Sequence, residues 1–350
     1  MKILIAGDWA WHQYEQAFAD ALRELGHEVV KLATPRNPVR FFDKLESALS
    51  LPGFSMLANN IGLLVATIWK KPDVVLLWRA TFILPITAAL VARISTLATY
   101  NNDDPFGWKK KGRSAWRQRV MWRHYLKVLR FAKVNFFYRA INVAESWVFG
   151  SGCSKILMPY FIPDQHVPVS IAQDDFQIYE ADISFIGHYE PDGRDYLLVA
   201  LAEAGLNVRV WGPSNWNSAS APGFSELFPN IMPAYGSEYT KAVAASKVCL
   251  GFLSKINRDL YTRRCFEIPA MGKPLLVERT SELEKLFKED VEMCFFDNTK
   301  DLVLKATSLV SKPSRLNSIG QAALIRSWTS GYDVVTRAEA FVRDLEGFED

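Results

Sequence analysis

The chain begins with an apolar strand, a glycine-containing loop and a helix, and the same order of elements returns in its second half. Residues 2–6 predict a strand, and the loop that starts at Gly7 leads into a helix that ends near Gly26. Residues 181–213 repeat this order and add a second strand. Because strands that alternate with helices form parallel sheets, we expect an α/β fold.

Further strands are predicted in both halves. Residues 72–78 form a continuous apolar run of the kind that is covered on both faces, and residues 95–104 end in a polar stretch. Residues 145–160 predict two more short strands. In the second half, strands are expected at 247–253 and 274–278, and a helix lies between them.

The length of 350 residues suits two α/β domains of ordinary size. We predict an N-terminal domain over residues 1–165, a C-terminal domain over residues 175–328, and a helical segment over residues 329–350 that closes back over the rest. Ligands of parallel sheets bind at the carboxyl ends of the strands, so the cleft between the domains is the expected site.

Several classes of protein are disfavoured. The four cysteines lie far apart, and no cluster of His, Asp and Glu has metal-ligand spacing, so neither a metal nor a disulfide framework is expected. Neither of the glycine loops contains GxGxxG, which argues against NAD or FAD. Asp8 interrupts the apolar N-terminus, so no signal peptide is predicted. We expect a cytoplasmic protein without transmembrane segments, since no apolar stretch reaches the roughly 20 residues that cross a bilayer.

One carboxylate lies in an unusual place. Glu267 is flanked by Phe266 and Ile268 in a run that is otherwise apolar. An ionised carboxylate is costly to bury unless partners satisfy it, and it can accept hydrogen bonds from two neighbouring hydroxyl groups at once. Two interpretations stay open. Glu267 holds the sugar of a ligand, or it pairs with Arg263 or Arg264 across one helical turn.

Five motifs follow one another in the second half. They are DISFIGHYEPDGR (182–194), VRVWGP (208–213), YTKAVAASKVCLGFLSKINRD (239–259), TRRCFEIPAMGKPLLVE (262–278) and EMCFFDNTKDL (292–302). In this order they resemble the C-terminal half of the CgeB-like (spore maturation protein-like) glycosyltransferases, which are related to glycosyltransferase family 4. The resemblance implies a GT-B fold, with two Rossmann-like domains that face a cleft and a C-terminal helix that packs back on the first. It also implies a nucleotide-diphospho-sugar as donor and no further cofactor.

The resemblance assigns roles to single residues. Family 4 enzymes carry two acidic residues separated by seven others, and the second precedes a glycine by five positions. Here these residues are Asp259 and Glu267, which implies that Glu267 accepts hydrogen bonds from the ribose and that Asp259 lies near the donor sugar. Arg194 matches the position of an arginine that binds phosphate, where basic groups offset the charge of the leaving diphosphate. The other candidates for nucleotide-sugar binding are Gly187, Gly212, Lys255, Arg258 and Arg264.

An inverting transfer needs a base, and the N-terminal half offers four candidates at the ends of predicted strands. They are Asp8, His12, Asp103 and Asp104. Asp104 precedes a proline and is also typical of ordinary turn chemistry. A retaining transfer would need no such base, and both mechanisms stay open.

A basic stretch covers residues 108–139, with eleven lysines and arginines and no acidic residue. The chain has 41 basic and 38 acidic residues, so without this stretch 30 basic residues face 38 acidic ones, a net charge of −8. Interleaved aromatic residues are typical of a helix on an anionic membrane surface or against an anionic acceptor. The alternative is a helix whose aromatic face packs inside the domain. No nucleic-acid-binding motif accompanies the stretch.

These observations predict a metal-independent glycosyltransferase. Its acceptor would be a glycan or a lipid-linked sugar in the biosynthesis of a cell-surface lipopolysaccharide, capsule or glycoprotein, at the inner face of the cytoplasmic membrane. A nucleotide-sugar epimerase of the same fold is one alternative, and the basic stretch argues against it. A non-catalytic, membrane-associated glycan-binding protein is the other, and it would not hydrolyse a donor.

Overall fold

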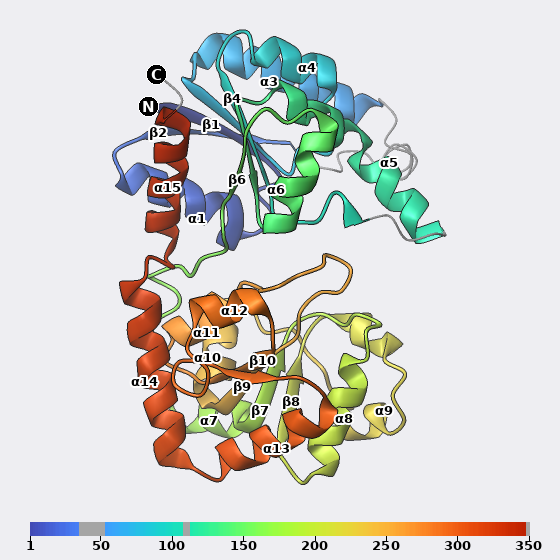
Figure 1. Ribbon diagram of the computed structural model, residues 1–350, viewed down its shortest axis with the longest axis vertical. Helices are drawn as coiled ribbons and strands as arrows, with labels where there is room; N and C mark the ends of the chain where they lie inside the picture. Colours follow the sequence, from blue (N-terminus) through green and yellow to red (C-terminus); the bar gives the residue numbers. More distant parts are fainter. Residues whose placement is uncertain (35–52, 108–112, 348–350) are drawn as a thin grey trace. The chain divides into compact units, whose positions relative to one another are not determined.

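The computed structural model describes residues 1–34, 53–107 and 113–347 (Figure 1). The chain divides into two compact units, one formed by residues 1–158 with the chain from Val334 onward, the other by residues 159–333. Each unit is built on one parallel sheet with helices, as expected for an α/β protein. The chain passes from the first unit to the second after residue 158 and returns to the first after residue 333. The sequence predicted that the N-terminal domain ends at residue 165 and that the C-terminal domain covers residues 175–328.

The sheet of the first unit has the strand order β2-β1-β3-β4-β5-β6. After β1 the chain adds β2 on one side and then β3 on the other, so the order reverses between β1 and β3, where ligands of such sheets bind. The strands are β1 (Lys2–Gly7), β2 (Glu28–Ala33), β3 (Val74–Trp78), β4 (Thr96–Asn101), β5 (Val134–Phe137) and β6 (Ser154–Ile156). The described helices are α1 (Ala17–Glu24), α3 (Phe54–Lys70), α4 (Pro85–Val91), α5 (Arg113–Val128), α6 (Ala140–Ser146) and α15 (Val334–Glu346).

Helix α15 completes the core of this first unit. The Phe341 ring lies 5.4 Å from the ring of Phe18 on α1 and 4.9 Å from that of Phe136 on β5, and all three side chains are fully buried. This confirms the predicted return of the C-terminal helix to the first domain.

Phe341→Ala should therefore destabilise the first unit by about 3–5 kcal/mol, because a buried ring is replaced by a cavity. Hydrogen exchange of the β1 and β5 amides measures this loss. Amides of the second unit serve as the control, and protection in β1 and β5 equal to that of the wild type would contradict the assignment of α15 to this core.

The sheet of the second unit has the strand order β11-β10-β9-β7-β8, and its order reverses between β7 and β9. Its strands are β7 (Ala181–Ile186), β8 (Val208–Trp211), β9 (Ser246–Gly251), β10 (Leu275–Glu278) and β11 (Cys294–Phe296). Its helices are α7 (Gln173–Tyr179), α8 (Arg194–Glu203), α9 (Phe224–Leu227), α10 (Ser237–Ala245), α11 (Arg264–Ala270), α12 (Ser281–Leu286), α13 (Thr299–Val310) and α14 (Pro313–Thr329).

The structure corrects the expectation of two strands within residues 145–160. Residues 145–160 contain only one strand, β6, and the other strand, β5, lies within the basic stretch. All four β5 residues are buried, and the strand lies between β4 and β6 although basic residues surround it in sequence.

The aromatic residues of the basic stretch are mostly buried. Trp122, Tyr125, Phe136 and Phe137 lie in the interior of the first unit, which agrees with the alternative of an inward aromatic face. Trp116 is exposed, and Trp108 lies outside the described residues. Among the basic residues, Arg139 is buried and donates to the carbonyl of Asn102.

Candidate functional site

The loops of the second unit meet where its strand order reverses. The Ser254 hydroxyl, in the loop after β9, donates to Glu190, in the loop after β7, at 3.0 Å. From the start of α11, the Arg264 guanidinium donates to the carbonyl of Ile186, the last residue of β7, at 3.2 Å. These contacts bring together the carboxyl ends of β7 and β9 and the N-terminus of α11.

Glu267 lies in the first turn of α11 and is 4% exposed. Its Oε1 accepts a hydrogen bond from Arg263 Nε at 2.8 Å, and its Oε2 accepts one from the Tyr239 hydroxyl at 3.0 Å. Arg264 Nη1 lies 3.9 Å from Oε2. Burial raises the pKa of Glu267, but the two arginines and the Tyr239 hydroxyl outweigh it and hold the pKa at about 2. The carboxylate is therefore ionised at neutral pH.

His166 contributes a neutral ring to this cluster. Its Nδ1 accepts a hydrogen bond from the Ile162 amide at 2.8 Å, which leaves the proton on Nε2, 3.9 Å from Glu267 Oε1. Burial lowers the pKa of His166 to about 4, against the opposing effect of the Glu267 carboxylate. Sequence spacing did not reveal His166 or Tyr239, because they reach Glu267 from a distant loop and from α10.

This burial predicts a pH dependence of stability. In the unfolded chain His166 gains a proton below about pH 6.5, whereas in the folded chain it stays neutral down to about pH 4. Protonation thus favours the unfolded state, and lowering the pH across that window should reduce the free energy of unfolding by up to about 3 kcal/mol. Denaturant titrations of the wild type and His166→Gln measure it. The variant should lose less stability across the window, and parallel curves would contradict the assignment.

Arg264 is the cation of the cluster that reaches solvent. Its side chain is 35% exposed, whereas that of Arg263 is 8% exposed. The guanidinium carbon lies 5.4 Å from the centre of the Tyr239 ring, which supports the guanidinium beside the end of β7. Arg264 is therefore placed to bind an anionic ligand at the ends of the strands.

The predicted phosphate-binding residue Arg194 has a different environment. Asp192 binds its guanidinium through two hydrogen bonds of 2.8 and 2.7 Å, and the His188 carbonyl accepts a third at 2.7 Å. Arg194 is 4% exposed, and Glu190 lies 3.6 Å away. Its charge is balanced inside the loop after β7, so the structure favours a role in holding that loop.

The other residues predicted to bind the nucleotide-sugar in this unit have different environments. Lys255 forms an ion pair of 2.7 Å with Glu278. Asp259 and Arg258 are partly exposed in the loop after β9, and the φ angle of Arg258 is 51°, a left-handed conformation that is uncommon for arginine. A Cβ atom on Gly212 would collide with the Gly187 carbonyl and the Trp216 indole, so Gly212 permits close packing of the β7 and β8 ends.

Metal ligands were not predicted. In residues 1–34, 53–107 and 113–347, no three His, Cys, Asp or Glu side chains lie close enough together to hold a metal ion.

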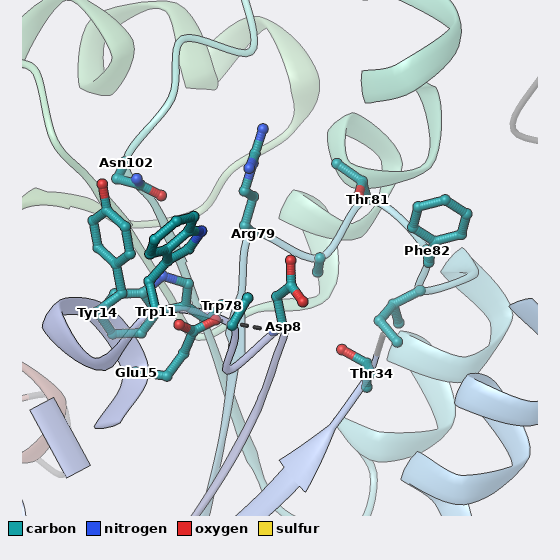
Figure 2. A pocket seen from close by; sticks show the side chains of 13 residues that line it. Asp8, Trp11, Tyr14, Glu15, Thr34, Trp78, Arg79, Thr81, Phe82 and Asn102 are labelled. Atoms are coloured by element: carbon teal, nitrogen blue, oxygen red, sulfur yellow. Dashed lines mark hydrogen bonds between the residues drawn. The ribbon is translucent and has the colours of Figure 1, made fainter. Parts of the chain in front are cut away.

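The first unit has a pocket where its own strand order reverses. The pocket has a volume of about 90 Å³ and is lined by residues that follow β1, β2, β3 and β4, among them Asp8, Thr34, Arg79 and Asn102. Figure 2 shows the Asp8 carboxylate in the space between the Arg79 and Thr34 side chains. Asp8 is exposed, so this carboxylate is available to a ligand.

The loops around this pocket are held in uncommon conformations. Trp9 and Arg79 have φ angles of 59° and 53°, in the left-handed region. The buried Glu15 accepts a hydrogen bond from the Asp8 amide at 2.9 Å, and burial raises the pKa of Glu15 against the backbone bonds that lower it. Sequence analysis did not single out Glu15, which positions the Asp8 loop.

The remaining candidates in the first unit are less available. Asp103 forms an ion pair of 2.5 Å with Arg79, and His12 is exposed beyond the pocket lining. Asp104 is buried and accepts hydrogen bonds from the amides of Phe106 and Gly107 and from the Asn142 side chain. The structure therefore supports the turn interpretation of Asp104 over a catalytic one.

Residues 194–343 match the model of a family described as Glycosyl transferase-like. The matched region is a glycosyltransferase domain. It includes α11 with Glu267, the loop after β9 and the helix α8 that begins at Arg194. The predicted class of enzyme, a glycosyltransferase, is thereby confirmed. No curated protein sequence matches the chain at a significant level.

Solved structures share the architecture of the glycosyltransferase at low sequence identity. Sucrose-phosphate synthase from Thermosynechococcus elongatus aligns with a TM-score of 0.70 and 11% identity over 99% of both chains. HepE from Anabaena, in complex with UDP-glucose, aligns with a TM-score of 0.71 and 13% identity over 99% of this chain and 100% of that chain. A structure from Listeria monocytogenes described as a UDP-N-acetylglucosamine 2-epimerase gives a TM-score of 0.57 and 13% identity over 100% and 96%. The predicted GT-B fold is confirmed.

Proposed function

We propose that the second unit binds a nucleotide-diphospho-sugar and that the chain transfers the sugar to a hydroxyl group of a glycan or lipid-linked acceptor. The observation that carries this proposal is the ionised, buried carboxylate of Glu267 with two arginines at the strand ends of a glycosyltransferase domain. An anionic leaving group needs positive charge at its binding site, and acidic residues specify ribose hydroxyls.

In this proposal, Arg264 binds the diphosphate. It combines partial exposure with a guanidinium fixed at the end of β7. Arg194 does not take this role, because Asp192 and Glu190 already balance its charge. Lys255, which pairs with Glu278, and Arg258 are proposed to extend the diphosphate site from the loop after β9.

Glu267 is proposed to fix the ribose. Its Oε2 accepts one hydrogen bond from Tyr239, and a carboxylate oxygen has two acceptor positions. Asp259, eight residues earlier in the adjoining loop, is proposed to contact the donor sugar. UDP-sugars are the first donors to test, since the structurally similar HepE is described in complex with UDP-glucose.

On the acceptor side, we propose Asp8 as the base that takes the proton of the attacking hydroxyl. Of the four candidates, Asp8 is the one that both lines the pocket and presents an exposed carboxylate there. A base of this kind implies inversion at the anomeric carbon. The CgeB-like and family 4 assignment, the cell-surface pathway and the inner face of the cytoplasmic membrane belong to the same proposal.

The proposal is tested by incubating the purified chain with UDP-, GDP-, ADP- and dTDP-sugars and measuring release of the nucleoside diphosphate. Slow hydrolysis of one donor without acceptor is expected, since water can replace the acceptor hydroxyl. An epimerase would instead convert the sugar and leave the nucleotide-sugar bond intact, and a binding protein would return the donors unchanged.

A further inference from the structure

Helix α3 presents a continuous row of large apolar side chains to solvent. Trp69 is 81% exposed and Ile61 is 60% exposed. The full row consists of Phe54, Leu57, Ile61, Val65, Ile68 and Trp69. Their spacing of three, four or one residues places them on one side of the helix. The outer side of α3 is therefore apolar along its whole length.

The opposite side of α3 is buried and carries polar groups. Asn60 donates to the carbonyl of Phe82 at 2.9 Å and accepts from the amide of Leu84 at 2.8 Å, and Thr67 donates to the carbonyl of Leu63 at 2.7 Å. The Asn60 bonds fix which side of α3 faces the protein, and the Thr67 bond satisfies its buried hydroxyl within the helix. A surface helix normally has the reverse arrangement, with its polar side outward.

Helix α4 extends the apolar surface. Ile86, Leu90 and Ile94 are exposed at intervals of four residues, along α4 and just past its end. The two helices are neighbours on the outside of the first unit (Figure 1). We call the exposed apolar residues of α3 together with these three the α3–α4 face. Nine large exposed apolar side chains along two neighbouring helices of a single chain are typical of an interaction surface.

Basic residues border the α3–α4 face. A groove of about 970 Å³ is lined by Ile68 and Ile94 together with Lys71, Arg93 and Lys133. Residues 53–139 contain fifteen lysines and arginines but three acidic residues. Of the three acidic groups, Asp73 lines the same groove and accepts from the Lys2 amide, Asp103 pairs with Arg79, and Asp104 is buried. The groove therefore has three basic residues against one acidic residue and carries a net positive charge.

We propose that the α3–α4 face inserts into the surface of an anionic phospholipid membrane, with the bordering basic residues on the lipid phosphates. Apolar side chains that meet basic ones at one edge are the pattern of an interfacial membrane site. A second copy of the chain is a poorer partner, because a symmetric contact would bring the same positive border against itself. No helix in the described part of the chain is long and apolar enough to cross a bilayer.

The proposal is tested by flotation of the full chain with vesicles of phosphatidylcholine alone and with vesicles in which about a third of the lipid is phosphatidylglycerol. We expect the wild type to float with the anionic vesicles. Ile61→Ser combined with Trp69→Ser should reduce the bound fraction at least about tenfold, because two large apolar side chains no longer leave water. Lys71→Glu with Arg93→Glu should lower binding to anionic vesicles by about tenfold or more.

A matched control lies in the second unit. Ile178 and Leu304 are 57% and 61% exposed, close to the 60% of Ile61, and serine at both positions should leave flotation unchanged. A wild type that does not float with anionic vesicles would overturn the proposal, as would an Ile61/Trp69 variant that floats like the wild type. If the wild type forms a dimer that this variant dissociates and neither floats, the face binds a second copy instead. Hydrogen exchange of the β1 and β5 amides checks that the first unit of each α3–α4 variant is folded. Nucleotide titration tests the donor site in the second unit separately, so a failure of flotation is distinguishable from a failure of the donor site.

Discussion

Asp8→Asn is expected to slow sugar transfer by about 10²- to 10⁴-fold, the range over which general bases contribute. Asparagine keeps the size of the side chain but cannot accept a proton from the attacking hydroxyl. The Asp8 amide would still donate to Glu15, so the loop after β1 should keep its conformation. Because Asp8 belongs to the first unit and the donor residues to the second, the affinity for nucleotide should not change.

The measurement is the rate of nucleoside diphosphate release from the preferred donor, with and without acceptor. Asp20→Asn is a matched control, since Asp20 is an exposed aspartate in the same unit, paired with Arg23 on α1. Its rate should stay within about twofold of the wild type. An Asp8→Asn variant with the rate of the wild type would show that Asp8 is not the base and would favour a retaining mechanism.

Arg264→Ala is expected to weaken binding of the nucleoside diphosphate by about ten- to a hundredfold, the effect of losing a hydrogen bond to a charged group. The loss should be smaller for the monophosphate and smallest for the nucleoside, since the guanidinium is proposed to contact the diphosphate. Glu267 would keep its hydrogen bonds from Arg263 and Tyr239, so the cluster should stay intact.

Calorimetric titration of the variant with these three ligands measures the effect. Arg209→Ala is the control, since Arg209 is an exposed arginine on β8 of the same unit. Arg264→Lys should bind with intermediate affinity, because an ammonium supplies charge without the paired donors of a guanidinium. Equal loss for the nucleoside and the diphosphate would contradict a phosphate contact and indicate a change in the ribose site.

The periodic features of the sequence predicted most of the fold. Strand β3 is a continuous apolar run, β7 is mostly apolar, and the alternation of such strands with helices specifies parallel sheets. Strand β5 was missed because the net charge of the basic stretch obscured four buried residues. The burial of Trp122 and Tyr125 depends on the helix packing of the first unit, which charge and aromatic content do not reveal.

The candidate site was predictable only in its local part. The contact between Arg263 and Glu267 spans one helical turn and was foreseen as an alternative. His166 and Tyr239 approach Glu267 from elements far away in sequence, so spacing carried no signal for them. The pairing of Arg194 with Asp192 is local in sequence, but only the geometry shows that Asp192 and the His188 carbonyl together bind all three guanidinium nitrogens.

Binding of nucleotides to the second unit is the most direct test of the proposed donor site. The wild type should be titrated calorimetrically with UDP, GDP, ADP, CMP and dTDP, and Glu267→Gln, verified as folded by circular dichroism, with the best of them. We expect one nucleoside diphosphate to bind with micromolar affinity and the variant to bind it at least about tenfold more weakly, since its amide replaces an ionised acceptor. A wild type that binds none of the five nucleotides would contradict the proposed donor site.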